Sequence, residues 1–294
     1  PPRLPVFARY EPPRGYSPAA VHHIYHRGFS GHDALIATLV NLGIKGVIDI
    51  DARDKKDTRL TPKAGPGEKL AAEEALLERK LMADGEVTLG KEYNKDFTSA
   101  YTAFRKRVSD KFGGDYFKWN VGYTIAAIAL SAIAIIFAIA QSHSWNIWLT
   151  LLIIAIALMN GVFMYLMPAA TPKGEKVRSA IEGFRLYLET AEKLQLNAAE
   201  VGTGRPPPMT KERYETFLPY AIALGVEQPW TEHFEKQLPR VAEDYNPGWA
   251  HVGYGATSSL HNVTHAVTSN ISSAVSSSMP QSSSSSGSGG GGFS

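Results

Sequence analysis

Residues 119–172 read WNVGYTIAAIALSAIAIIFAIAQSHSWNIWLTLLIIAIALMNGVFMYLMPAATP and contain no Asp, Glu, Lys or Arg. Two apolar runs lie within this segment, at 121–141 and 145–167. A helix of about 20 residues spans roughly 30 Å, which is the thickness of a bilayer's hydrocarbon core. A buried hairpin in a soluble core is a poor alternative, because so long an uncharged stretch is rare in soluble helices. The sequence therefore predicts a transmembrane helical hairpin over 119–168, with its turn at 142–144.

Basic residues flank this hairpin on both sides, whereas the turn has no formal charge. Cytoplasmic segments next to membrane spans are rich in Lys and Arg, so we expect both flanks in the cytoplasm and the turn 142–144 on the extracytoplasmic side. The basic excess also lies where anionic headgroups would attract it. The flanking cations are Arg105, Lys106, Arg107, Lys111 and Lys118 before the hairpin, and Lys173, Lys176 and Arg178 after it.

The side chains of the two runs indicate an anchor rather than a conduit. Transport and proton relay usually need acidic, basic or histidine side chains inside the membrane, and the runs contain none. The lipid bilayer is therefore the first partner that the sequence predicts. Trp and Tyr favour membrane interfaces, and those expected there are Trp119, Tyr123, Trp145, Trp148 and Tyr165.

The rest of the chain has an ordinary composition, a formal net charge of +2 and no cysteine. The absence of cysteine excludes disulfides and thiolate chemistry. The charge balance is too even to indicate a nucleic-acid partner. The sequence contains no phosphate-binding glycine loop, nucleophile elbow or metalloprotease helix motif, so we expect no enzymatic activity and no cofactor.

The part before the hairpin is expected to form an arm and one module. The proline-rich residues 1–16 predict an extended arm. Ser17 predicts the start of a helix, a second helix follows over 33–42, and 47–61 has the pattern of a strand hairpin. Because helix, helix, hairpin is the order of a winged helix, we expect residues 17–118 to form a winged-helix-like module in the cytoplasm.

Helices are also expected after the membrane hairpin. Apolar residues in 173–244 recur at spacings of three and four, which predicts a helical cytoplasmic region. Residues 245–294 are rich in Ser, Gly, Asn and Thr, so we expect a tail that buries no core and is disordered at least from Ser276. The predicted fold class is thus mostly α with small β-hairpins, around a two-helix transmembrane hairpin.

Several segments resemble the YciQ-like predicted membrane proteins (the DUF2207 family), a bacterial family of unknown function. The resemblance covers nearly the whole chain in order, and LPYAIALGVEQPW at 218–230 is its most specific part. It implies a multi-pass protein of the bacterial plasma (inner) membrane, with an external domain and a first transmembrane helix that precede the present chain. It supplies no catalytic residues. The other segments are ARYEPPRGYSPAAV at 8–21, ALIATLVNLGIKGVIDI at 34–50, TPKGEKVRSAIEGFRLYLETAE at 171–192 and the glycine-rich terminus.

Histidines form the densest set of potential metal ligands. His22 and His26 are four residues apart on one predicted helix, and His32 follows. A zinc site needs three or four converging ligands, and no cysteine assists here, so a solvated helix end is the simpler interpretation. A His-ligated, metal-dependent enzyme is kept as the second alternative function. Glu73 and Glu74, on another predicted helix, are interpreted as part of a solvated helix face.

DNA binding is the first alternative function, because a winged helix on a membrane anchor is a known arrangement for a transcription regulator. The candidate recognition helix, 33–42, contains no Lys or Arg, and Asn41 is its one side chain suited to reading a base. Cations in the following hairpin alternate with Asp, which cancels most of their field. A nucleic-acid partner is therefore not expected.

The leading hypothesis is a non-enzymatic, membrane-anchored scaffold or sensor component that acts through unidentified protein partners. Its predicted interaction surface lies after the hairpin, where apolar helix faces dock either on the first module or on a partner. The residues of that surface are Tyr214, Phe217, Leu218 and Trp230.

Overall fold

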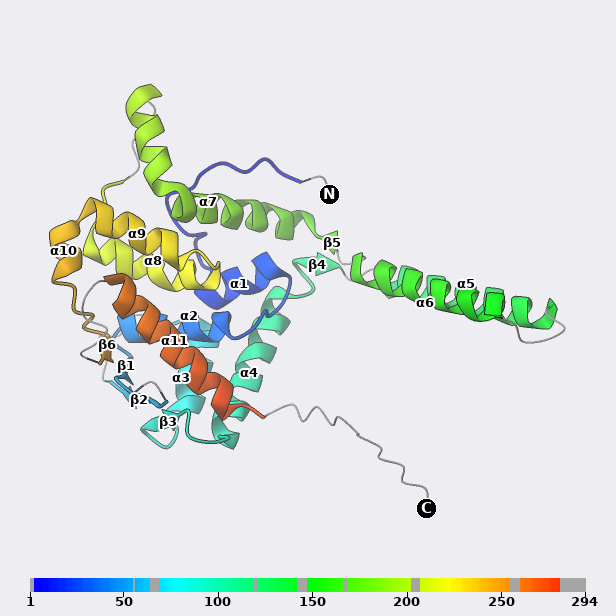
Figure 1. Ribbon diagram of the computed structural model, residues 1–294, viewed down its shortest axis with the longest axis horizontal. Coiled ribbons are helices and arrows are strands. Elements are labelled where there is room, and N and C mark those ends of the chain that lie inside the picture. Colours follow the sequence, from blue (N-terminus) through cyan, green and yellow to red (C-terminus); the bar gives the residue numbers. More distant parts are fainter. Residues whose placement is uncertain are drawn as a thin grey trace, which may run out of the picture.

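The computed structural model describes residues 3–54, 56–63, 69–118, 121–141, 147–166, 169–201, 207–253 and 260–280. A mostly helical body contains two small sheets, and a long helical hairpin projects from one side of it (Figure 1). Figure 1 shows α7 along one side of the body and the larger sheet on the opposite side.

The hairpin consists of α5 (Val121–Gln141) and α6 (Ile147–Leu166), which pack side by side. Their mean hydropathy is 2.4 over Gly122–Gln141 and 2.3 over Ile147–Met164, so both are long and apolar enough to cross a membrane. The predicted first run matches α5, and α6 begins two residues later and ends one residue earlier than the predicted second run. The turn at 142–144 lies outside the described residues.

Both ends of the hairpin join the body at one place. The strands β4 (Phe117–Lys118) and β5 (Ala169–Ala170) pair antiparallel just below the two helices. The hydroxyl of Thr171 donates to the carbonyl oxygen of Asp115 at 2.6 Å. A Cβ on Gly174 would lie 2.1 Å from the carbonyl oxygen of Tyr116, so only glycine permits this close approach. The hairpin is therefore held at its base by backbone contacts from both sides.

The chain before the hairpin forms helices and strands in the predicted order helix, helix, hairpin. Ser17 caps the first helix by accepting a hydrogen bond from the amide of Ala20 at 3.2 Å, and Pro18 occupies its first turn. The elements are α1 (Pro18–His26), α2 (Asp33–Ile44), β1 (Ile48–Ala52), β2 (Thr58–Pro62), α3 (Ala72–Leu81), β3 (Val87–Leu89) and α4 (Lys95–Phe112).

The chain after the hairpin is helical, as predicted for 173–244. It forms α7 (Pro172–Val201), α8 (Lys211–Ala223), α9 (Glu227–Gln237) and α10 (Pro239–Glu243). α8 packs across α1 and α2, and the buried side chains of both halves belong to one hydrophobic cluster. The parts of the chain before and after the membrane hairpin thus share a single core.

The prediction that residues 245–294 bury no core is wrong for Ala250–Val252 and Leu260–Ser278, and the predicted disordered end lies outside the described residues from 281 on. Strand β6 (Ala250–Val252) pairs parallel with β1, which gives the larger sheet the order β3-β2-β1-β6. Helix α11 (Leu260–Ser278) then packs on that sheet, on α2 and on α9. Its apolar residues recur at spacings of three and four, and the Ser- and Thr-rich composition hid this pattern. Its buried apolar side chains are Leu260, Val263, Val267, Ile271, Ala274 and Val275.

The predicted extended arm is extended, and it is attached along α7. The amide of Arg9 donates to the carbonyl oxygen of Gly183 at 3.0 Å. The hydroxyl of Ser179 donates to the carbonyl oxygen of Pro5, also at 3.0 Å. A Cβ on Gly183 would lie 2.1 Å from the carbonyl oxygen of Phe7. The arm therefore belongs to the body.

Candidate functional site

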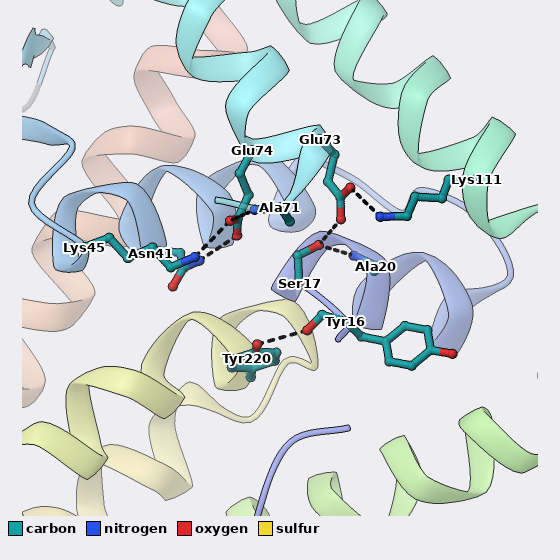
Figure 2. A network of polar contacts seen from close by, with 10 residues as sticks. All are labelled: Tyr16, Ser17, Ala20, Asn41, Lys45, Ala71, Glu73, Glu74, Lys111 and Tyr220. Carbon is teal, nitrogen blue, oxygen red and sulfur yellow. Dashed lines mark hydrogen bonds and ion pairs between the residues drawn. The ribbon is translucent and has the colours of Figure 1, made fainter. Parts of the chain in front are cut away.

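Two buried carboxylates lie in the first turn of α3, beside the base of the hairpin. The relative exposure of Glu73 is 0% and that of Glu74 is 1%, so the prediction of a solvated helix face is wrong for both. A buried carboxylate is costly unless hydrogen-bond donors and cations satisfy it. Figure 2 shows the two side chains extending from α3, each toward a different set of partners.

Glu73 joins α3 to α1 and α4. The hydroxyl of Ser17 donates to Oε1 at 2.6 Å, and Nζ of Lys111 lies 3.2 Å from Oε2. Ser17 also caps α1, so one hydroxyl serves both the helix start and the carboxylate. Because α4 leads into β4 and the hairpin, the Lys111–Glu73–Ser17 chain links the segment before the hairpin to α1.

Glu74 joins α3 to α2. Asn41 Nδ2 donates to Oε1 at 2.7 Å, and Nζ of Lys45 lies 2.9 Å from Oε2. The amide of Ala71 also donates to Oε2 at 2.9 Å, which caps the helix start. All four oxygens of the two carboxylates are therefore occupied. We call Glu73, Glu74, Ser17, Asn41, Lys45 and Lys111 the glutamate network.

An open cleft of about 500 Å³ lies beside the glutamate network. Its lining combines tyrosines with three lysines, Lys45, Lys69 and Lys111. The phenol of Tyr220 donates to the carbonyl oxygen of Tyr16 at 3.0 Å. Burial raises the pKa of Tyr220, and burial together with the phenol of Tyr116 raises the pKa of Tyr16 to about 12. Both phenols are thus neutral hydrogen-bonding groups near pH 7.

Both carboxylates of this site are fully engaged by protein groups. A general acid or base needs a carboxylate that reaches a substrate, whereas these carboxylates already accept a bond at every oxygen. The network instead connects four helices, and the cleft presents ammonium and phenol groups beside it. One sequence pattern points to part of this site: Ala71 and Glu74 have the spacing of a helix cap and its third residue.

The candidate metal ligands are not brought together in the structure, and the solvated helix end that the sequence favoured is wrong for His22. His22 is buried, with Nδ1 2.9 Å from the carbonyl oxygen of Ala223 and with Nε2 accepting from the amide of Ser30 at 3.2 Å. Both ring nitrogens therefore bond to backbone groups. The ring of His26 packs 4.4 Å from that of His22, and His32 precedes α2 beside Tyr101. Among the described residues, no three potential ligands converge as a metal ion requires.

The predicted interaction residues lie inside the body. Tyr214, Phe217, Leu218 and Trp230 are all buried, and Nε1 of Trp230 donates to the carbonyl oxygen of Tyr214 at 3.3 Å. The phenol oxygen of Tyr214 lies 2.9 Å from the hydroxyl of Thr264 on α11. The sequence left open whether these side chains dock on the rest of the chain or on a partner, and the structure packs them within the chain. They form no exposed surface for another protein.

The candidate recognition helix is also buried. Every residue from Ala34 to Gly43 lies in the interior, and Asn41 uses its amide to bond Glu74. A helix in this position is covered on all sides and does not enter a DNA groove as it stands. The structure thus gives the DNA-binding alternative no recognition helix at α2.

The predicted interface aromatics are described only in part. Tyr123 and Trp148 are 71% and 76% exposed on the surface of the hairpin. Trp119 and Trp145 lie outside the described residues, as does the side chain of Tyr165. The two described side chains therefore face the surroundings of the hairpin.

Comparison with known proteins identifies the family. The family model described as "Predicted membrane protein (DUF2207) C-terminal domain" matches residues 7–234, from the arm to α9. Neither the curated proteins nor the solved structures gave a match. β6 and α11 lie beyond the matched residues, although they complete the sheet and the core. The chain therefore belongs to this family of predicted membrane proteins, as the resemblance in the sequence implied.

Proposed function

We propose that this protein is a non-enzymatic, membrane-anchored scaffold or sensor component, with its body on the cytoplasmic side of a bacterial inner membrane. One observation carries the proposal: both ends of an apolar hairpin are tied to a single body. The described residues of α5 and α6 include no acidic or basic side chain, and Asn160 on α6 donates to Ser131 on α5 at 2.8 Å. Such a hairpin anchors the body.

The sensor role rests on the position of the glutamate network. A displacement of the hairpin moves β4 and α4, and Lys111 on α4 is bonded to Glu73. Glu73 in turn bonds Ser17 at the start of α1, where the arm enters the body. A partner bound at the cleft therefore contacts the elements that respond to the anchor. Residues 17–118, as a winged-helix-like module, supply most of this surface, and Tyr16 and Tyr220 complete the cleft.

A photo-crosslinking residue at position 69 tests the proposal. Lys69 is exposed at the rim of the cleft, so a photoreactive amino acid there reaches a bound partner in native membranes. We expect a discrete protein adduct, and we expect Glu73→Gln to weaken it without unfolding the body. The matched control places the same amino acid at Lys80, which is exposed at the other end of α3. Equal adducts at both positions, or none at position 69, would contradict a partner site at the cleft.

A further inference from the structure

Four exposed cations lie around the base of the hairpin. Lys106 and Arg107 belong to α4, Lys118 ends β4 and Lys176 lies in the first turns of α7. None of the four forms an ion pair with another residue in the part of the chain that the structure describes. We call them the basal cations.

Most acidic groups near the basal cations are already engaged. Asp115 pairs with Lys173 at 3.0 Å, and the buried carboxylate of Glu175 accepts a bond from the amide of Leu4 at 3.3 Å. Glu73 is paired with Lys111. Asp110 is the exposed acid on this part of α4, and it reduces the positive field without cancelling it.

The larger sheet, across the body from α7, has a different charge arrangement. Four cations on or next to its strands pair with neighbouring carboxylates, which weakens the field that this surface offers a charged partner. The pairs are Arg53–Asp51 at 2.5 Å, Arg59–Glu86 at 3.2 Å, Lys63–Asp49 at 3.6 Å and Lys91–Asp57 at 3.3 Å. The unpaired cations at the hairpin base thus differ from the paired cations of the sheet.

The fold keeps the basal cations close to the bilayer surface. Figure 1 shows α4 on the side of the body nearest the hairpin, with its C-terminal end beside β4. Lys106 and Arg107 lie five to six residues before Phe112 at that end, which corresponds to about 8–9 Å along the helix. Electrostatic attraction in physiological salt extends over about 8 Å, which is comparable to the distance of these cations from the helix end beside the hairpin.

We propose that the basal cations bind the anionic phospholipid headgroups of the bilayer that the hairpin crosses, which holds α4 against the membrane surface. The partner is a lipid surface, because the hairpin fixes these cations at that surface at all times. The interaction rests on the hairpin crossing the bilayer, as proposed above, and it forms without a protein partner at the cleft. It sets the tilt of the body, and with it the access to the cleft.

The full chain in lipid nanodiscs tests this proposal. Because the chain has no cysteine, Thr102→Cys gives one labelling position on α4, exposed and one turn before Lys106. A fluorophore at position 102 is quenched by lipids that have a spin label on the headgroup. We expect stronger quenching in discs that contain phosphatidylglycerol than in discs of phosphatidylcholine alone. We also expect added salt to remove the difference in quenching between the two lipid compositions, because salt screens the attraction.

Two matched double variants locate the effect. K106Q/R107Q should lower the ratio of docked to undocked body roughly 30-fold, as the attraction typical of two surface cations predicts. R79Q/K80Q removes the same charges from the exposed end of α3 and should leave the quenching unchanged. Equal quenching in both lipids, or equal loss in both variants, would overturn the proposal. A response to soluble duplex DNA, without a response to phosphatidylglycerol, would also overturn it and would assign the surface to nucleic acid.

Discussion

At the residue scale, the glutamate network depends on a few short bonds in the interior. Glu73 and Glu74 look like ordinary surface acids in the sequence, because their burial depends on α1, α2 and α4, which pack around them. A local sequence pattern does not predict this burial, because the side-chain partners lie 29 to 56 residues away along the chain. Neither the bond of Glu74 to the amide of Ala71 nor the pairing of Glu73 with Ser17 and Lys111 was predicted from the sequence.

Replacing Glu73 by alanine tests the network. The change leaves the hydroxyl of Ser17 without its acceptor in the interior and Lys111 without its partner, so we expect a loss of about 2 kcal/mol in unfolding free energy. Glu73→Gln keeps an acceptor for Ser17 and should cost less. Denaturant unfolding of the detergent-solubilised chain measures both. Glu78→Ala on the same helix is the control, and an equally large effect there would argue against a specific role for Glu73.

His23 should make the stability depend on pH. Its side chain is buried, its Nδ1 has no hydrogen-bond partner among the described residues, and burial lowers its pKa to about 4. Below pH 6.5 the imidazole of His23 therefore binds a proton in the unfolded chain, whereas in the folded chain it stays neutral until the pH approaches 4. Stability should fall as the pH drops from 6.5 toward 4, by about 1–2 kcal/mol at pH 5.

His23→Phe checks this pH dependence. Thermal unfolding at pH 7 and at pH 5 should show a smaller difference in the variant than in the native chain. Some difference should persist, because burial also lowers the pKa of His22, His26 and His32. The exposed His265, replaced by glutamine, serves as the control. An unchanged pH difference in His23→Phe would show that His23 does not titrate as described.

At the element scale, helices with an uninterrupted apolar pattern were predicted well, whereas two elements near the C-terminal end were not. The membrane helices were predicted nearly residue for residue, because length and uninterrupted apolarity define them locally. α11 was missed because many Ser and Thr residues lie between its apolar residues. Such hydroxyls can donate to the helix backbone, as Thr268 does to the carbonyl oxygen of Thr264 at 3.0 Å. β6 was missed because its pairing with β1 joins segments far apart in the sequence.

Ile271→Asp tests whether α11 is part of the core. Ile271 is fully buried, so a carboxylate there should cost about 3 kcal/mol or more and release the helix. Ser273→Asp places the same charge at an exposed position of α11 and should have little effect. Hydrogen exchange of residues 260–278 reports the release directly. Rapid exchange in the native chain would contradict a packed helix.

Gly183→Ala tests the attachment of the arm. Glycine to alanine inside a helix usually stabilises it by up to about 1 kcal/mol. Here the new Cβ would meet the carbonyl oxygen of Phe7, so the arm must move away from α7. We expect faster tryptic cleavage after Arg9. Gly161→Ala, at a helical glycine with open space around it, should leave the cleavage rate unchanged; equal rates in both variants would argue against the contact.

At the scale of the whole molecule, one body is assembled from both sides of a membrane hairpin. The hairpin divides the sequence into two parts, and docking of the second part on the first was one of two alternatives that the sequence left open. The structure packs α8 across α1 and α2, with Phe217 and Leu218 in the shared core. The sequence could not decide between the alternatives, because the contact joins segments on opposite sides of the hairpin. Both ends of the hairpin are therefore attached to one shared core.

Cysteine accessibility in intact cells tests the central claim most directly, namely that the hairpin crosses the membrane and leaves the body on the cytoplasmic side. The chain has no cysteine, so Ser142→Cys in the predicted turn and Ser99→Cys on the exposed face of α4 form a matched pair. A membrane-impermeant thiol reagent should label position 142 in intact cells and position 99 only after the cells are opened. Labelling of position 99 in intact cells, with position 142 protected, would contradict the account.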